Sequence, residues 1–178
     1  HNILFISIDD FRPKINSYGE SQMITPNLDK LASEGLQFNN AFTNIAVCGA
    51  SRASIMTGIR PSQERYNDYT TRASKDTPEA VTLNQLFMEN GYETISYGKI
   101  YHFPDDTKEY WSDSDGGAHQ ADYQDPEAQA RKKNGEIGEH GRKGPAFEYP
   151  EVDDYVYNDG KITKRALMKM KDLKVLLI

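Results

Sequence analysis

The strongest constraint on the fold is an apolar run near the start of the chain that ends in two aspartates. Residues 2–8 are mostly large aliphatic and aromatic side chains, and Asp9 and Asp10 follow directly. A short continuous apolar run predicts a strand that is buried on both faces, as in a parallel sheet. We therefore expect residues 2–8 to form a central strand with both carboxylates at its carboxyl end.

Helical and extended patterns alternate after this strand. Thr25 and Pro26 mark a helix start, because threonine favours the N-cap and proline the first helical position. The sequence predicts a helix over 25–35, a strand over 38–43, a helix over 49–58, a helix from a capping-box pattern at 82–85 to 90–91, and a strand over 93–97. This alternation implies an α/β fold with a doubly wound, mostly parallel sheet and helices on both faces.

The later part of the chain has a different pattern. Residues 103–160 are rich in Asp, Gly, Lys and Pro and lack apolar periodicity, which predicts a long irregular surface excursion. Residues 161–178 return to a helical pattern and then begin another strand. We expect residues 1–178 to be the N-terminal part of one domain, with the core elements and the active-site motifs in 1–102. Because the predicted sheet ends on a starting strand, we expect it to be incomplete.

Composition excludes some function classes. The formal net charge of −6 argues against general nucleic-acid binding, which needs a basic face. It does not exclude an anionic substrate, since a local pocket of cations can override the overall charge. No apolar run is long enough to cross a bilayer, so no transmembrane segment is expected.

Asp9 and Asp10 are the first candidate functional residues. The predicted fold places them at the edge of the sheet where open α/β sheets bind ligands. Adjacent carboxylates repel each other unless a cation holds them, and such oxygen ligands suit Ca²⁺ or Mg²⁺. The alternative is a turn or a helix cap, where aspartate is common.

Cys48 is the only cysteine in the chain and begins a predicted helix. Its thiolate would be favoured by the helix dipole and by Arg52, which lies four residues on and so on the same helical face. The alternative is a buried small hydrophobic residue. A cysteine phosphatase loop needs an arginine six residues on, where Ser54 stands, and a zinc site would need further ligands.

Lys99 and His102 follow the predicted strand at 93–97. The lysine offers a fixed positive charge for an anion, and the histidine offers proton transfer near neutral pH. Taken singly, an exposed lysine and a loop histidine are the alternatives. One cleft at the strand ends would nevertheless collect both with the aspartates and Cys48, and that set is what hydrolysis of an anionic ester requires.

These motifs together resemble the type I sulfatases, whose signature cysteine is converted to formylglycine. The run from Cys48 to Gly58 is similar to that signature, and Ala46-Val47 with Arg60-Pro61 most resembles the iduronate-2-sulfatase-like branch. Three further segments are similar to parts of the family. Residues 2–10 resemble its first strand with the metal ligands, and residues 25–35 resemble its first helix. Residues 98–102 resemble its Gly-Lys…His motif. The resemblance implies an alkaline-phosphatase-like α/β fold.

The resemblance also implies the cofactors. Cys48, as hydrated formylglycine, would be the nucleophile. Asp9 and Asp10 would bind a divalent cation, usually Ca²⁺ with Mg²⁺ as the alternative, which also contacts residue 48. The family's later metal ligands and its leaving-group acid have no match up to Ile178, so we expect a C-terminal segment to complete the site.

Three basic residues have roles implied by the resemblance. Arg52 would stabilise the formylglycine and the bound anion, Lys99 would bind sulfate oxygens, and His102 would help to deprotonate the second hydroxyl of the formylglycine hydrate. The implied activity is hydrolysis of sulfate monoesters on a sulfated sugar or glycosaminoglycan fragment. The alternatives are a truncated or inactive sulfatase fragment, and a phosphatase or phosphonate hydrolase of the same superfamily.

Ala50 stands where the signature usually has proline. Maturation systems of the anaerobic bacterial type accept alanine there, so we expect a bacterial protein that a formylglycine-generating enzyme modifies. Its expected location is the periplasm or the exterior, with a signal peptide removed, rather than a lysosome.

Overall fold

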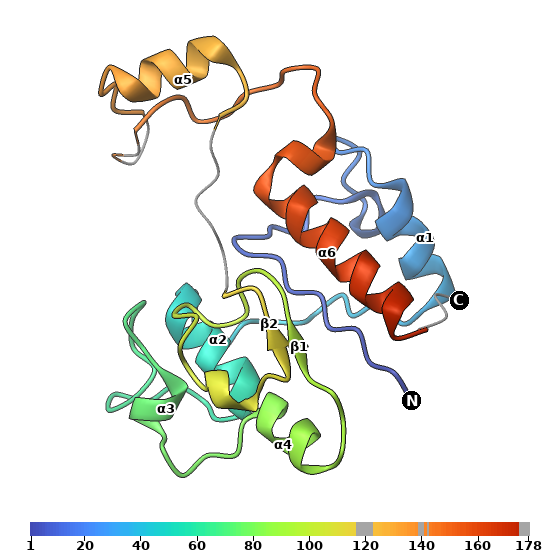
Figure 1. Ribbon diagram of the computed structural model, residues 1–178, viewed down its shortest axis with the longest axis vertical. Helices are drawn as coiled ribbons and strands as arrows, with labels where there is room; N and C mark the ends of the chain where they lie inside the picture. Colours follow the sequence, from blue (N-terminus) through green and yellow to red (C-terminus); the bar gives the residue numbers. More distant parts are fainter. Residues whose placement is uncertain (117–122, 139–140, 142, 175–178) are drawn as a thin grey trace. The chain divides into compact units, whose positions relative to one another are not determined.

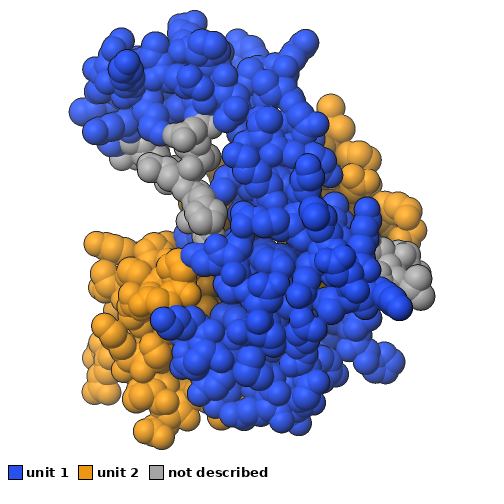
Figure 2. Space-filling model, in the orientation of Figure 1, with its two compact units in different colours: residues 1–3, 84–100, 107–178 blue, residues 4–83, 101–106 orange. Residues whose placement is uncertain are grey.

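The computed structural model describes residues 1–116, 123–138, 141 and 143–174 of the 178-residue chain. The chain forms two compact units, which Figure 2 shows in different colours. Unit 1 consists of residues 1–3, 84–100 and 107–178, and unit 2 of residues 4–83 and 101–106.

Unit 2 contains the first helices of the chain, of which α1, α2 and α3 are labelled in Figure 1. They are η1 (Asn16–Tyr18), α1 (Pro26–Glu34), α2 (Cys48–Thr57) and α3 (Ala73–Asp76). The helix predicted over 25–35 is confirmed, with Pro26 in the first turn and Gly35 at the C-cap. Asp29 joins α1 to η1, because its carboxylate accepts hydrogen bonds from the Ser17 N–H (3.0 Å) and the Thr25 hydroxyl (3.1 Å).

Helix α2 is the best-buried element of unit 2. Ala50, Ala53 and Met56 are all buried, as expected for a helix that packs inside the unit. Gly58 ends the helix in the left-handed conformation, with φ at 69°, and its N–H donates to the Ser54 carbonyl. The predicted helix at 49–58 is therefore confirmed, with its first residue at Cys48.

Unit 1 contains a short parallel sheet and the remaining helices. Its elements are α4 (Leu83–Glu89, whose first residue belongs to unit 2), β1 (Ile95–Ser96), η2 (Lys108–Tyr110), β2 (Asp113–Ser114), α5 (Pro126–Lys133), η4 (Asp154–Val156) and α6 (Asn158–Asp172). Strands β1 and β2 pair in parallel, with Ile95 opposite Asp113. Among the described residues, unit 1 therefore combines helices with a parallel strand pair, and the named elements of unit 2 are helices.

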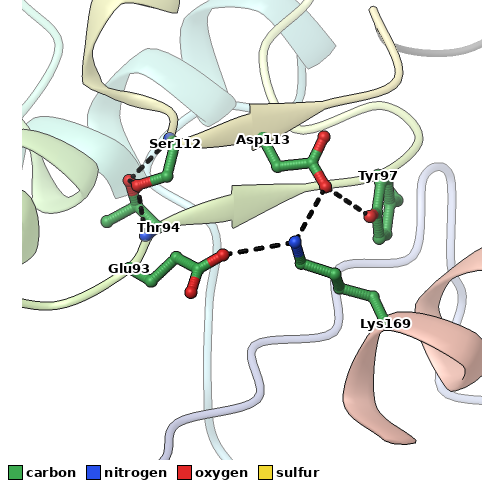
Figure 3. A network of polar contacts seen from close by, with 6 residues as sticks. All are labelled: Glu93, Thr94, Tyr97, Ser112, Asp113 and Lys169. Carbon is green, nitrogen blue, oxygen red and sulfur yellow. Dashed lines mark hydrogen bonds and ion pairs between the residues drawn. The ribbon is translucent and has the colours of Figure 1, made fainter. Parts of the chain in front are cut away.

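Helix α6 is tied to this strand pair by charged side chains (Figure 3). Lys169 lies 3.2 Å from a Glu93 carboxylate oxygen and 3.3 Å from one of Asp113, and the Tyr97 hydroxyl donates to Asp113 at 2.9 Å. The bond from Tyr97 and the nearby Lys169 ammonium lower the pKa of Asp113. Burial and the same carboxylate raise the pKa of Tyr97.

Two predicted strands do not form in this structure. Residues 2–8 have no regular secondary structure, and Ile3, Leu4 and Ile6 are exposed. Residues 38–43 lie in turns and irregular backbone. A strand is stable only when neighbouring strands satisfy its backbone groups, and the described residues supply only the two-residue strands β1 and β2.

Other boundaries also differ from the predictions. The strand expected over 93–97 is limited to β1. Residues 103–160, expected to be irregular, contain β2 and α5. The apolar pattern could not reveal β2, because its two residues are polar and are held by backbone pairing. The strand expected to begin within 174–178 lies outside the described residues apart from Lys174.

No described helix combines the length and apolar character needed to span a membrane.

Candidate active site

Helix α2 places two of the predicted site residues on one face. Cys48 is the first residue of the helix and Arg52 follows one turn later. Cys48 is half-buried and free of any disulfide, whereas Arg52 is buried. The start of α2 also carries the positive end of the helix dipole, which favours a negatively charged group at residue 48.

Arg52 connects α2 with the end of the apolar run. Its Nη2 donates to Asp9 Oδ1 at 2.9 Å, and its Nη1 lies 3.5 Å from Ser7 Oγ. The arginine side chain is 10% exposed and the aspartate side chain 39%, so the pair lies at the boundary between interior and solvent. A buried guanidinium needs such a partner, because an unpaired buried charge is strongly unfavourable.

Asp10 is placed differently from its neighbour. Both aspartates are exposed, but the backbone of Asp10 is left-handed, with φ at 53°. Within the described ranges, no group of three or more His, Cys, Asp or Glu side chains is arranged to hold a metal ion. Asp9 and Asp10 therefore do not form such a group with the other described residues.

His102 and Cys48 come together although 54 residues separate them in the sequence. The distance from Cys48 Sγ to His102 Nδ1 is 3.3 Å, within hydrogen-bond range for sulfur. The hydrogen lies on the sulfur or on the ring nitrogen according to the histidine tautomer. The contact gives residue 48 a neighbouring group that can donate or accept a proton.

Aromatic side chains surround His102. The rings of Tyr69 and Phe103 lie edge-on to the imidazole, with centroids 5.9 Å and 4.9 Å away. The Tyr69 backbone also packs against Gly49, where an added Cβ would lie 2.3 Å from the Tyr69 carbonyl oxygen. Sequence reasoning missed Tyr69 and Phe103, and only the glycine directly after Cys48 hinted at a close backbone approach.

Lys99, the remaining predicted site residue, belongs to unit 1 and follows β1. The preceding Gly98 has a left-handed backbone with φ at 73°, and its N–H donates to Asp115 Oδ1 at 3.0 Å. An added Cβ at Gly98 would lie 3.1 Å from the Ile162 side chain of α6. The backbone beside Lys99 is therefore fixed by β2 and α6.

The chain is similar in sequence to known sulfatases. A family model described as Sulfatase matches residues 1–170. The chain is 41% identical over 117 residues to iduronate 2-sulfatase from Homo sapiens, a match that covers 62% of this chain and 21% of that protein. It is 36% identical over 129 residues to N-acetylglucosamine-6-O-sulfatase from Bacteroides thetaiotaomicron, covering 71% of this chain and 22% of that protein. A protein named Sulfatase from Formosa agariphila is 37% identical over 108 residues, covering 57% and 21%. The chain spans about a fifth of the length of these relatives.

Proposed function

Because the chain belongs to the sulfatase family, we propose that the complete protein hydrolyses sulfate monoesters. The observation that carries the proposal is the contact of 3.3 Å between Cys48 and His102 at the start of α2, with Arg52 on the same helical face. This arrangement combines a position for a nucleophile with a group for proton transfer and a nearby cation. These are the parts that attack on a sulfate ester needs.

Residue 48 is proposed to act after conversion of its thiol to formylglycine, which supplies a hydroxyl nucleophile when hydrated. His102 is proposed to accept or donate a proton at residue 48, and its contact of 3.3 Å with Cys48 supports this role. The helix start at Cys48 favours the negative charge of a sulfate group, and Arg52 adds a positive charge one turn away. Lys99 is proposed to bind sulfate oxygens.

Asp9 and Asp10 are proposed to hold a divalent cation, Ca²⁺ or Mg²⁺, together with residue 48. Their carboxylate oxygens fit such a cation, which would stabilise negative charge on a sulfate oxygen. Calcium takes about six to eight oxygen ligands, which is more than Asp9, Asp10 and residue 48 supply. A C-terminal segment of the complete protein is proposed to provide the remaining ligands.

The proposed substrate is a sulfated sugar or glycosaminoglycan fragment. Relatives named for iduronate and N-acetylglucosamine sulfates support this class. We propose maturation by a formylglycine-generating enzyme and a periplasmic or secreted location, and similarity to proteins from Bacteroides and Formosa is consistent with a bacterial setting.

The test is to purify the complete protein from a host with the maturation enzyme and to assay sulfate release alongside mass spectrometry of the tryptic peptide of residues 31–52. We expect formylglycine at position 48 and hydrolysis of a sulfated sugar. Cys48→Ala should abolish turnover, because alanine cannot become formylglycine. Ile55→Ala, at an exposed position of the same helix, should leave it unchanged.

Three other results would contradict this function or its mechanism. Full activity with an unmodified thiol at position 48 would exclude the formylglycine mechanism. Faster cleavage of aryl phosphates than of aryl sulfates would indicate the related phosphatases or phosphonate hydrolases. A fully converted, folded protein that releases no sulfate from a panel of sulfated sugars would indicate an inactive member of the family.

A further inference from the structure

His102 is carried by a segment without regular secondary structure. Residues 101–106 form bends and turns, and one backbone hydrogen bond within the segment runs from the Asp106 N–H to the Phe103 carbonyl at 3.0 Å. Such a segment does not hold a side chain in place by itself. The 3.3 Å contact between His102 and Cys48 therefore depends on what anchors residues 101–106 within unit 2.

Asp106 is the best-buried polar anchor of this segment. Its side chain is 2% exposed, and its two carboxylate oxygens accept hydrogen bonds from the Ala73 N–H (2.7 Å) and the Ser74 N–H (3.1 Å). These are the first backbone donors of α3, whose N-cap residue, Arg72, makes no side-chain capping bond. Asp106 thus caps α3 from 33 residues away, which fixes the end of segment 101–106 to that helix.

Arg72 forms a second link between the same two segments. Its Nη1 lies 2.8 Å from Asp105 Oδ1, and its guanidinium stacks 4.0 Å from the centre of the Phe103 ring. Phe103 in turn lies edge-on to His102. Two residues that follow His102, Phe103 and Asp105, are therefore tied to the start of α3. Helix α3 in turn contacts α2, which carries Cys48.

We infer that Asp106 is a positioning residue for His102: its buried carboxylate holds residues 101–106 on α3 and so keeps the imidazole against residue 48. Its importance for catalysis rests on the proposed function, since that function assigns proton transfer to His102. The positioning itself is a property of the folded protein. The two parts can therefore be tested separately.

The structural test follows the His102 ring by nuclear magnetic resonance in the complete protein labelled with ¹³C-histidine. The His102 resonance is assigned by its loss in His102→Ala. We expect Asp106→Ala to shift this resonance, because the ring moves relative to Tyr69 and Phe103. Asp125→Ala is the matched control: Asp125 also accepts two N–H groups at a helix start, that of α5, but lies in unit 1.

The kinetic test measures sulfate release by the same variants. Displacing a catalytic group can reduce the rate by about 100-fold. We therefore expect Asp106→Ala to lower kcat by about 10- to 100-fold with little change in KM. In a His102→Ala background the same change should have almost no further effect, whereas a general loss of folded protein would lower activity in both backgrounds.

Asp106→Asn keeps one hydrogen-bond acceptor and nearly the same shape, so it replaces the alanine variant if that variant does not fold. It should give a smaller shift of the His102 resonance and a smaller loss of kcat. Unshifted His102 resonances in a folded Asp106 variant would overturn the inference. Equal losses of kcat in Asp106→Ala and Asp125→Ala would do the same. A shifted resonance in a protein that never releases sulfate would support the positioning role and contradict the proposed function.

Discussion

Arg52 has the most demanding environment of the candidate site residues, because its charged side chain is almost completely buried. Asp9 lies 2.9 Å away and compensates that charge. We expect Asp9→Asn to lower the free energy of unfolding by about 1–3 kcal/mol, because the charge-assisted hydrogen bond is lost while the guanidinium stays buried. The partial exposure of Asp9 keeps the effect below that of a fully buried pair.

The measurement is urea unfolding of the metal-free protein in the presence of a chelator, so that cation binding does not contribute. Asp10→Asn is the matched control, since the adjacent carboxylate is exposed. Its change should stay within about 0.5 kcal/mol, as is usual for surface substitutions. Equal effects of both substitutions would show that the ion pair with Arg52 does not stabilise the fold.

At the residue scale, the sequence indicates which side chains have suitable chemistry but not which partners they contact. The chemistry of Cys48, Arg52 and His102 makes them candidates in the sequence, and the structure brings Cys48 and His102 into contact. Their catalytic roles stay predictions. The pairing of Asp9 with Arg52 was not predicted, because Asp9 was expected either to bind a cation or to form a turn or helix cap. Asp106 was missed, since an aspartate in a polar segment gives no signal that it will be buried.

At the element scale, Lys169, Asp113 and Tyr97 connect α6 with the strand pair (Figure 3). The fold lowers the pKa of Asp113. A carboxylate with a depressed pKa stabilises the folded state above its unfolded value of about 3.9, and this contribution is lost as the pH falls through the lower folded value. We therefore expect the link between α6 and the strands to weaken in acid.

Asp113→Asn should remove this dependence. The difference in melting temperature between the original protein and the variant should be constant from about pH 7 to pH 5 and should close below about pH 4. Thermal unfolding followed by circular dichroism checks this, with Asp172→Asn, an exposed position at the end of α6, as the control. A difference that stays constant down to pH 2 would contradict the prediction.

Helices were predicted more accurately than strands because their signals are local. Thr25-Pro26 and Gly35 bound α1, and the helix after Thr82 begins at Leu83. Asp125-Pro126 was an equally readable start for α5, since Asp125 caps the helix and Pro126 is in its first turn. Strand formation depends on partners distant in sequence, so apolar runs alone predicted two strands that this structure does not contain.

At the scale of the whole molecule, the apolar run at residues 2–8 conflicts with its exposure. Ile3, Leu4, Phe5 and Ile6 are between 51% and 69% exposed. The run therefore has the composition of a buried strand without the neighbours that would bury it. Because the chain spans about a fifth of the length of its relatives, we propose that strands elsewhere in the complete protein pair with this run.

This proposal predicts opposite results at two exposed isoleucines. In the complete protein, Ile6→Asp should lower the free energy of unfolding by more than about 3 kcal/mol, because a carboxylate would be buried in the sheet. Ile24→Asp, in an irregular segment where the isoleucine is 93% exposed, should change it by less than about 0.5 kcal/mol.

Hydrogen exchange should also show slow amide exchange at residues 3–8, since a central strand donates its N–H groups to its neighbours. A neutral Ile6→Asp together with fast exchange at these amides would mean that the run stays outside the sheet. Asp9 and Asp10 would then lack the strand end on which the proposed cation site depends.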